Sequence, residues 1–521
     1  MPIPPRLPSP IGCQCGRDAP RELLAQVEPY LDELMSVYFD HVAPCYPIVE
    51  EEYIMTRIQT QGHRLPQLFS IILISHALFY WELSPNLQLH RRPDQDLAWQ
   101  SAVALSAASI QRGDVATIAT ICIGVSGRPC QRLVNNATNM ARSVALAHII
   151  GLNHDCQGWK IRDLEKRTRV KVWWALLIQD RWFNFAQGTP PYISQDHYDV
   201  PMPTVGLLLQ GGRADSHKHI RAAEIYIKLC ELTEIIGGVL PIIYRLRVGA
   251  GRRSTSIDRV SRAESDLDRW IEELPVWLNM TDFSDSRPQV PGLVNLQLSY
   301  LSIRMLLRRI SWQGDSLDTR QTMGEQASDQ AWTLSCKAAA EDVVRFVISL
   351  TKDDLTGFWL PYNAHHFTSA ATLLLRCALQ QPINPKMRDQ CITSALDMVN
   401  CLRKYRDEHR WDLAETCLSQ SESTLNRILD LATKTVGSAT ATRSNSTPYA
   451  RTYQRQSDLN DLIGQNPSND NGKGAYTSEY SSFILPDQEH ASSLEALFPE
   501  IFDDWYTDNF LPEPDDFNFD V

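Results

Sequence analysis

The chain has 521 residues, a length typical of two to four domains of about 150 residues each, and 43% of its residues are hydrophobic. Its formal net charge of −12 is concentrated in residues 436–521, which contain four Lys or Arg residues against fifteen Asp or Glu residues. Residues 1–435 are therefore almost neutral, and this excludes a broad basic surface for nucleic acid, which requires clustered Lys and Arg.

Neither secretion nor membrane insertion is predicted. The N-terminal residues MPIPPRLPSPIGCQC lack the apolar core of a secretory signal. The most apolar run, Leu68 to Trp81, is too short to span a bilayer and indicates a buried helix. Twelve cysteines are scattered through predicted helices, which favours a reducing compartment, cytosol or nucleus, over a secreted disulfide framework.

Helical periodicity dominates the chain from Leu31 onward. Apolar residues from Leu31 to Val42 follow the i, i+3, i+4 spacing of an amphipathic helix. Further helices are predicted at 65–81, 96–111, 114–124, 131–152, 163–186, 219–238, 255–273, 293–311, 331–350, 362–379, 385–407 and 419–433. Gly151 and Gly188 follow two of these helices as stop signals. Alternating strand-like runs are scarce, so we expect an all-α, irregular multi-helix body over 21–435.

The composition changes on both sides of this body. Residues 1–20 are rich in proline and are predicted to be a disordered N-terminus. Residues 436–482 are rich in Ser, Thr, Asn and Gly, and they are predicted to form a disordered linker because they cannot bury enough apolar surface to offset their ordering entropy. In residues 483–521 aromatic residues alternate with acids, without any Lys or Arg. That alternation is typical of acidic activation segments.

Residues 131–204 combine two predicted helices with a proline-rich strap. The first helix, 131–152, ends in a polar turn, and the second begins near Asp163. Charged residues fill the first two turns of the second helix, and an apolar block follows. That helix is predicted to end at Gly188, after which two prolines force an extended strap to Pro203.

This stretch resembles the fungal-specific transcription factor domain, the regulatory region of binuclear zinc-cluster activators. The resemblance rests on motifs that occur in the family's order: Ile150-Gly151-Leu152-Asn153-His154-Asp155, Val172-Trp173-Trp174, Asp180-Arg181, Gly188-Thr189-Pro190 and Asp196 through Pro203. Two departures are mild, since Thr189 stands where the family has Arg and Asn153 is an insertion-like variant. The resemblance covers roughly 30–300, with family-like helices continuing to about 435. It implies structural roles for Trp173, Trp174, Asp180, Arg181, Gly188 and Pro190.

Two of these motifs have competing interpretations. Core packing explains Trp173 and Trp174 better than a ligand box does, because large aromatic side chains dominate buried area. Asp180 and Arg181 could sense an inducer through their charges. A partly buried, paired structural ion is favoured instead, because an unpaired buried charge is costly.

The zinc cluster that the resemblance implies is not found in this sequence. Such clusters hold two zinc ions on six cysteines, and a basic helix beside them enters the major groove. Near the N-terminus only Cys13 and Cys15 occur, and the next cysteine is Cys45. No metal ligand or cofactor is therefore predicted, and zinc is expected only with a cluster encoded upstream. Either the gene model begins too late or the protein works without binding DNA itself.

Catalytic motifs are scarce as well. The sequence contains no zinc-protease helix, no phosphate-binding loop and no dinucleotide-binding glycine pattern. Gly124-Val-Ser126-Gly127 comes closest to a nucleophile elbow but has the wrong spacing. No catalytic residue is predicted, and an enzyme on a helical scaffold without a recognisable motif is kept as the alternative.

The acidic tail contains the second candidate site. Its apolar residues form a stripe on a short predicted helix and are surrounded by acids, as in segments that bind a partner's groove. The predicted coactivator contacts are Leu497, Phe498, Phe502, Trp505 and Phe510. The alternative is a terminal helix that docks on the body's own surface.

Together with the resemblance, these features predict a nuclear regulator of RNA polymerase II genes in a fungus. We expect an activator of a metabolic or secondary-metabolite gene set, with a helical body that regulates or dimerises. The expected partners are coactivator proteins and either a second copy of the chain or a DNA-binding partner in trans. DNA would be reached only through the missing zinc cluster or such a partner, and no membrane is involved.

Overall fold

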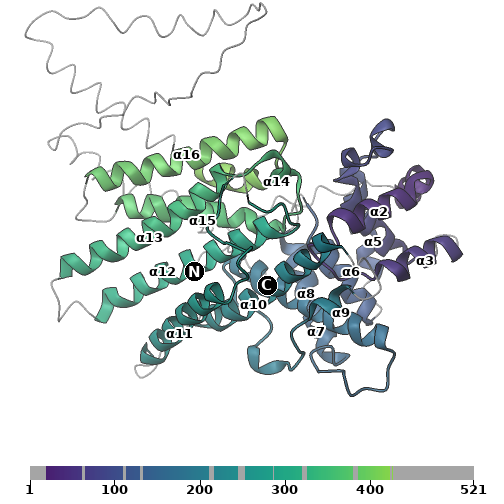
Figure 1. Ribbon diagram of the computed structural model, residues 1–521, viewed down its shortest axis with the longest axis horizontal. Helices are drawn as coiled ribbons and strands as arrows, with labels where there is room; N and C mark the ends of the chain where they lie inside the picture. Colours follow the sequence, from purple (N-terminus) through teal and green to yellow (C-terminus); the bar gives the residue numbers. More distant parts are fainter. Residues whose placement is uncertain are drawn as a thin grey trace, which may run out of the picture. The chain divides into compact units, whose positions relative to one another are not determined.

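The computed structural model describes residues 19–61, 65–109, 113–128, 133–209, 216–244, 253–284, 287–318, 325–379, 385–422 and 425. The chain divides into two units, residues 7–421 and a second unit made of 1–6 with 422–521, and almost all of the described residues lie in the first. Every regular element in the described ranges is an α-helix or a short 3-10 helix (Figure 1). The all-α prediction is thus confirmed for this part of the chain.

The helices of the first unit are labelled as in Figure 1. In chain order they are α1 (Ala19–Val27), α2 (Leu31–His41), α3 (Glu51–Gln61), α4 (Gln67–Leu78), α5 (Gln95–Ser109), α6 (Val115–Val125), α7 (Leu133–Ile149), α8 (Asp163–Gln187), α9 (Val205–Leu209), α10 (His217–Ile243), α11 (Arg253–Glu272), α12 (Leu293–Asp318), α13 (Glu325–Ile348), α14 (Lys352–Thr356), α15 (Ala364–Leu379) and α16 (Pro385–His409). Residues 413–421 are also helical.

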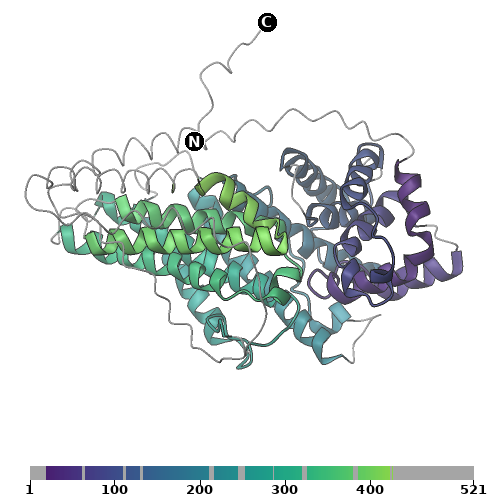
Figure 2. The ribbon, with the colours of Figure 1, turned by 90° about the horizontal axis from the view of Figure 1, so that it is seen from above.

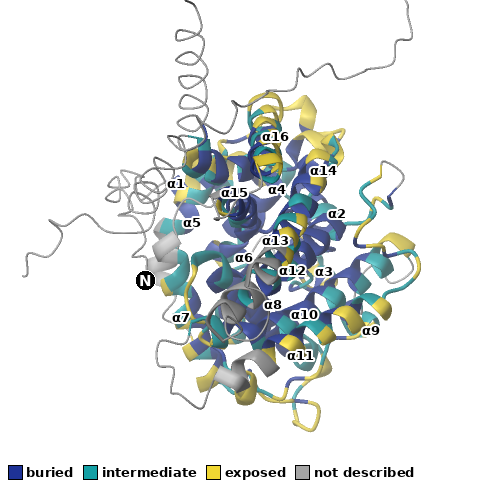
Figure 3. Ribbon diagram, turned by 90° about the vertical axis from the view of Figure 1, so that its left-hand side faces the viewer, coloured by how far each residue is buried: buried dark blue, intermediate teal, exposed yellow. Residues whose placement is uncertain are grey.

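Helices α8 and α10 pack against each other and connect the earlier helices to the later ones. On one side α8 contacts α6 and α7, while α10 packs on α11 and α12. The later helices α12, α13, α15 and α16 lie side by side, as Figures 1 and 2 show. Buried residues line the inner faces of the helices, and exposed residues gather on outer turns and loops (Figure 3). The body is therefore built by helix-on-helix packing around α8 and α10.

Local sequence signals explain several helix ends. Asp114 caps α6, because its side chain accepts a hydrogen bond from the Thr117 amide at 2.8 Å. Gly188 ends α8 with a φ of 68°, and Gly151 follows α7 with a φ of 61°. Both values lie in the left-handed region that glycine adopts without steric cost. The two predicted glycine stops are confirmed.

Four helices were not predicted from the sequence: α1, α3, α9 and α14. Helix α1 begins at Ala19, so the last two residues of the predicted disordered N-terminus are helical; Pro20 is tolerated in the first turn, where its missing amide needs no partner. Helix α3 is mostly polar, and α9 and α14 have five residues each, too few for periodicity to show. The helix predicted at 419–433 already begins at 413. Residues 1–18, 436–482 and 483–521 lie outside the described residues.

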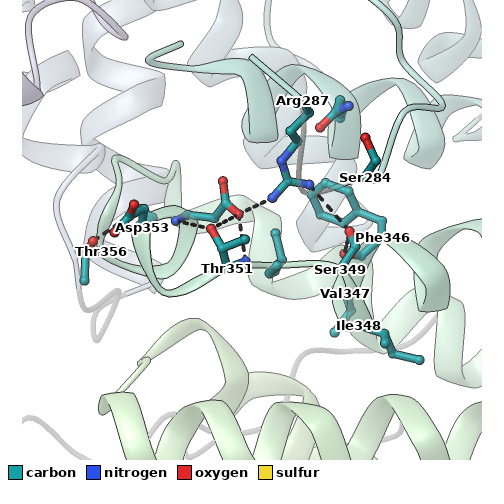
Figure 4. A network of polar contacts seen from close by, with 12 residues as sticks. Ser284, Arg287, Phe346, Val347, Ile348, Ser349, Thr351, Asp353 and Thr356 are labelled. Carbon is teal, nitrogen blue, oxygen red and sulfur yellow. Dashed lines mark hydrogen bonds and ion pairs between the residues drawn. The ribbon is translucent and has the colours of Figure 1, made fainter. Parts of the chain in front are cut away.

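A buried ion pair joins three segments of the later helices. Arg287, from the loop before α12, pairs with Asp354 of α14, and their side chains are only 2% and 5% exposed. Arg287 also donates to the hydroxyl of Ser349, just after α13 (Figure 4). Asp354 completes a capping box: its carboxylate accepts from the Thr351 amide at 2.7 Å, and its own amide donates to the Thr351 hydroxyl at 3.3 Å.

This network generates a stability prediction. Arg287→Ala leaves the Asp354 carboxylate buried without its cation, and the free energy of unfolding should fall by about 3–5 kcal/mol. The control is Arg345→Ala, because 64% of the Arg345 side chain is exposed and its buried partner, Asp342, keeps a second cation in Arg304 at 2.6 Å. That change should cost less than about 1 kcal/mol. Urea denaturation followed by circular dichroism measures both, and equal losses would contradict the prediction.

Candidate functional site

Helix α8 is buried on all sides along most of its length. All sixteen residues from Arg169 to Asn184 are buried. The charged first turns precede this block, so the partly exposed start of the helix and its buried middle follow from the sequence. The block includes polar groups that need partners; Lys171, for example, contacts Glu50 Oε1 at 2.9 Å. Burial lowers the pKa of Lys171, and the Glu50 carboxylate opposes that shift.

Trp173 and Trp174 lie in this buried block, 0% and 2% exposed. The Trp174 indole donates to the carbonyl of Pro201 at 2.8 Å. The Trp173 ring lies 5.3 Å from the Tyr198 ring, measured between centroids. Both tryptophans therefore contact residues 188–204, the segment that we call the strap.

Asp180 attaches the start of the strap to α8. Its carboxylate accepts the amide of Tyr192 at 2.9 Å and the amide of Ile193 at 3.0 Å. Asn184, one turn later, donates its side-chain amide to the Asp180 carboxylate at 2.9 Å. Burial raises the pKa of Asp180 to about 6, although the strap amides, Arg181 and Asn184 favour the charged form. The carboxylate thus replaces the backbone partners that the irregular strap lacks.

Arg181 attaches the middle of the strap and joins it to α10. Its guanidinium donates to the Thr233 carbonyl at 2.8 Å and to the Tyr198 hydroxyl at 2.8 Å, and it lies 3.3 Å from the Glu234 carboxylate. Tyr198 in turn donates to Glu234. We call Asp180, Arg181, Asn184, Tyr198 and Glu234 the strap anchor.

A glycine of α10 makes room for this arginine. A Cβ placed on Gly237 would lie 2.3 Å from Cζ of Arg181, closer than any real contact. The next residue, Gly238, has only the Gln195 side chain nearby, at 3.7 Å. Gly237 is therefore required for close approach, whereas Gly238 is not.

The structure brings the family-motif residues together around one junction. Asp180 and Arg181 do not pair with each other, and both are fully buried rather than partly buried as predicted. The reason is that α8 is surrounded by other elements, so Asp180 bonds to strap amides while Arg181 pairs with Glu234. Gly188 and Pro190 lie exposed at the beginning of the strap. The chemistry of this arrangement is attachment of one segment to another.

Tyr198 falls within the Asp196–Pro203 motif but was given no role from the sequence, and Glu234 and Gly237 were not predicted. The contacts of Tyr198 and Glu234 with Arg181 carry no local signal, because they form only in the tertiary fold. Gly237 did carry one, since adjacent glycines inside a predicted helix indicate close approach of another group.

A small cavity lies elsewhere, between α4, α5 and the segment before α15. Its volume is about 10 Å³, room for about one water molecule. It is lined by Ser75, His76, Phe79, Tyr80, Trp99, Ser126, Arg128, Phe358 and Trp359. Burial lowers the pKa of His76 to about 4, so its ring is neutral when it bonds to the Ile123 carbonyl at 2.9 Å. This space is too small for an organic effector.

No three His, Cys, Asp or Glu side chains in the described ranges gather closely enough to hold a metal ion. None of the helices in these ranges has both the length and the apolar character needed to cross a membrane. The predicted coactivator contacts, Leu497, Phe498, Phe502, Trp505 and Phe510, lie outside the described residues.

Comparison with known proteins identifies the class of protein to which these helices belong. Residues 35–273 match the family model described as the fungal specific transcription factor domain. The match runs from α2 to the end of α11 and includes α8, the strap and Gly237. This part of the chain is therefore a fungal specific transcription factor domain, and the predicted resemblance is confirmed.

Similar proteins are regulators of transcription in fungi. An uncharacterized transcriptional regulatory protein of Schizosaccharomyces pombe is 23% identical over 407 residues, which cover 77% of this chain and 58% of that protein. The transcriptional activator protein DAL81 of Saccharomyces cerevisiae is 22% identical over 383 residues, 65% of this chain and 38% of its own length. The acetamidase regulatory protein of Aspergillus oryzae is 24% identical over 430 residues, which cover 79% of this chain and 49% of that protein. The chain thus spans about half or less of most of these relatives, and no solved structure matches it.

The burial of the tryptophans leads to a second prediction. Trp173→Ala should leave a cavity and lower the free energy of unfolding by about 3–5 kcal/mol. The control is Trp159→Ala, because Trp159 is 37% exposed and mainly covers the Arg169 guanidinium. Its loss should cost about 1 kcal/mol. Chemical denaturation measures both, and a Trp173→Ala protein that unfolds like the parent would contradict burial of this ring.

The adjacent glycines of α10 give a matched pair. Gly237→Ala forces its methyl group against Arg181 and should cost about 1–3 kcal/mol of unfolding free energy. Gly238→Ala has space and should instead stabilise the helix by up to about 1 kcal/mol. Thermal melting of the two variants gives the comparison, and a shift in the same direction for both would show that Arg181 does not occupy this position.

Proposed function

We propose that this protein is a nuclear transcriptional regulator of RNA polymerase II genes in a fungus. The observation that carries the proposal is the match of residues 35–273 to the fungal specific transcription factor domain. Relatives named as transcriptional regulators align well beyond that range, over as much as 79% of the chain. The near-neutral charge of residues 1–435 supports a role for the body in protein contact rather than in direct binding of DNA.

The helical body is not proposed to contact DNA itself. The expected pattern of six cysteines is not present in the sequence, so DNA binding would come from a zinc cluster outside these residues or from a partner in trans. A second copy of the chain or another regulator would supply that partner. No cofactor belongs to the proposal apart from zinc in such a cluster.

The acidic aromatic segment 483–521 is proposed as the part that contacts a coactivator. Eleven acids and no Lys or Arg follow residue 486, and they surround the aromatic residues. Buried rings would provide binding free energy in a hydrophobic groove, while the acids would speed the encounter with a basic partner.

The regulated genes are proposed to be metabolic. One relative is named for acetamidase regulation, and another, from Fusarium vanettenii, is named a cutinase transcription factor. No catalytic reaction is assigned to this chain, because the family and its relatives carry the names of regulators.

A reporter assay tests the proposal. The full chain and residues 483–521 alone, each fused to an unrelated DNA-binding domain, should activate a reporter gene in a fungal host. Replacing Phe498, Phe502 and Trp505 together with alanine should abolish activation, because the rings supply the buried contact while the charge stays fixed.

The control replaces acids of the same segment with their amides. Since charges act mainly on the encounter rate, activation should then weaken gradually and depend on the number of acids removed. If the triple alanine fusion is as active as the parent, the groove-binding mechanism is wrong. A silent parent fusion would favour a docking segment instead.

A further inference from the structure

Thr189 lies beside the strap anchor and precedes a proline. The sequence contains Ser-Pro or Thr-Pro at Ser9, Ser84, Thr189 and Thr447. Of these, Ser84 and Thr189 fall within the described residues. Ser84 is 4% exposed and donates its hydroxyl to the Glu33 carboxylate at 2.6 Å. Thr189 is exposed and lies outside any helix, so it is presented to solvent while Ser84 is not.

The Thr189 hydroxyl is also hydrogen-bonded to the strap anchor. It donates to Asn184 Oδ1 at 2.7 Å, and the Thr189 amide bonds to the Asn184 carbonyl at 3.0 Å. Asn184 then donates to the Asp180 carboxylate, which holds the amides of Tyr192 and Ile193. Three consecutive hydrogen bonds therefore connect Thr189 to the Tyr192 and Ile193 amides further along the strap.

The electrostatic environment of Thr189 disfavours negative charge. Thr189 lies two residues beyond the C-terminal end of α8, where the carbonyl ends of the helix carry partial negative charge. The Asp180 carboxylate lies further along the same hydrogen-bond chain. Across from the helix end, Gln187 contacts His365, whose pKa burial lowers to about 4, so that this imidazole is neutral at cellular pH. Arg181 is already bonded to Thr233, Tyr198 and Glu234.

We propose that Thr189 is a phosphorylation site for a proline-directed Ser/Thr kinase, and that its phosphate releases the strap from α8. Pro190 keeps Thr189 in an extended conformation, which suits a kinase cleft, and opening the hydroxyl's bond to Asn184 is a small barrier. The kinase transfers the γ-phosphoryl group of ATP: the bond from phosphorus to the β,γ-bridging oxygen breaks and a bond to Thr189 Oγ1 forms. The hydroxyl proton passes to the kinase's base, and ADP leaves.

Phosphorylation then acts by two physical effects. The ester oxygen can no longer donate to Asn184, and a group of charge about −1.5 to −2 is placed at a helix C-terminus near a carboxylate. Both effects weaken the hydrogen bonds by which Asp180 holds Tyr192 and Ile193. The strap would then uncover Trp173 and Trp174, which contact Tyr198 and Pro201. This inference does not depend on the proposed role in transcription.

The test uses the purified full chain, a purified proline-directed kinase and ATP. Site-resolved mass spectrometry should find phosphate on Thr189 and none on Ser84, which serves as the internal control. Hydrogen exchange of the Tyr192 and Ile193 amides should become at least tenfold faster after modification, because those amides lose their acceptor. Two results would overturn the proposal: a free peptide spanning Thr189 that is phosphorylated while the folded chain is not, or a phosphorylated chain with unchanged exchange.

Two variants of Thr189 test the effect of charge separately from the effect of side-chain size, and they require no kinase. Thr189→Glu and Thr189→Gln have similar shapes and both lose the hydroxyl, but only the first is charged. Exchange at Tyr192 and Ile193 should be several-fold faster in Thr189→Glu than in Thr189→Gln. Equal exchange in the two variants would remove the electrostatic mechanism.

Discussion

The burial of α8 on all sides is the constraint on which the rest of the body depends. A helix surrounded by protein cannot leave its polar side chains to water, so its charged side chains require partners from other elements. Lys171 meets Glu50, Asp180 meets two strap amides, and Arg181 meets α10. These contacts specify which elements lie next to α8, whereas the surrounding apolar packing would tolerate several arrangements.

The strap shows how irregular backbone is accommodated next to such a helix. Its residues form only the short 3-10 helix Gln195–His197, so many of its amides and carbonyls lack partners within a helix or sheet. Side chains of α8 provide those partners, with Asp180 accepting strap amides and Trp174 donating to a strap carbonyl. The Asp-Arg pair of the family motif is therefore a device for attaching a loop, and its charges are not exposed for sensing a ligand.

Much of this fold could be predicted because helix periodicity and glycine stops are local signals. The bounds of α8 and α16 follow from apolar spacing and end signals within a few residues. Only half of the site could be predicted from the sequence, since Asp180 and Arg181 form a recognisable motif but their partners do not. Tyr198 and Glu234 come from elements that reach Arg181 only after α8 has packed on α10, and sequence spacing carries no record of that approach. Gly237 is the exception. A glycine in a helix interior lowers helix stability, so its presence there indicates that another group needs the space.

The strap anchor is buried, so a chemical signal can act on it only through residues that are exposed to solvent and hydrogen-bonded to it. Asp180 and Arg181 are fully buried, but Thr189 is exposed and Glu234 retains 32% of its side-chain exposure. A new charge at either position acts on hydrogen bonds inside a medium of low polarity, where electrostatic effects are larger than in water. The strap is bound by such polar contacts and by a few buried apolar residues, Ile193, Val200 and Pro203, whereas the helices beneath it are held by far more extensive apolar burial. Release of the strap would therefore require far less free energy than movement of α8, so a local chemical change can alter one surface of the body and leave its core intact.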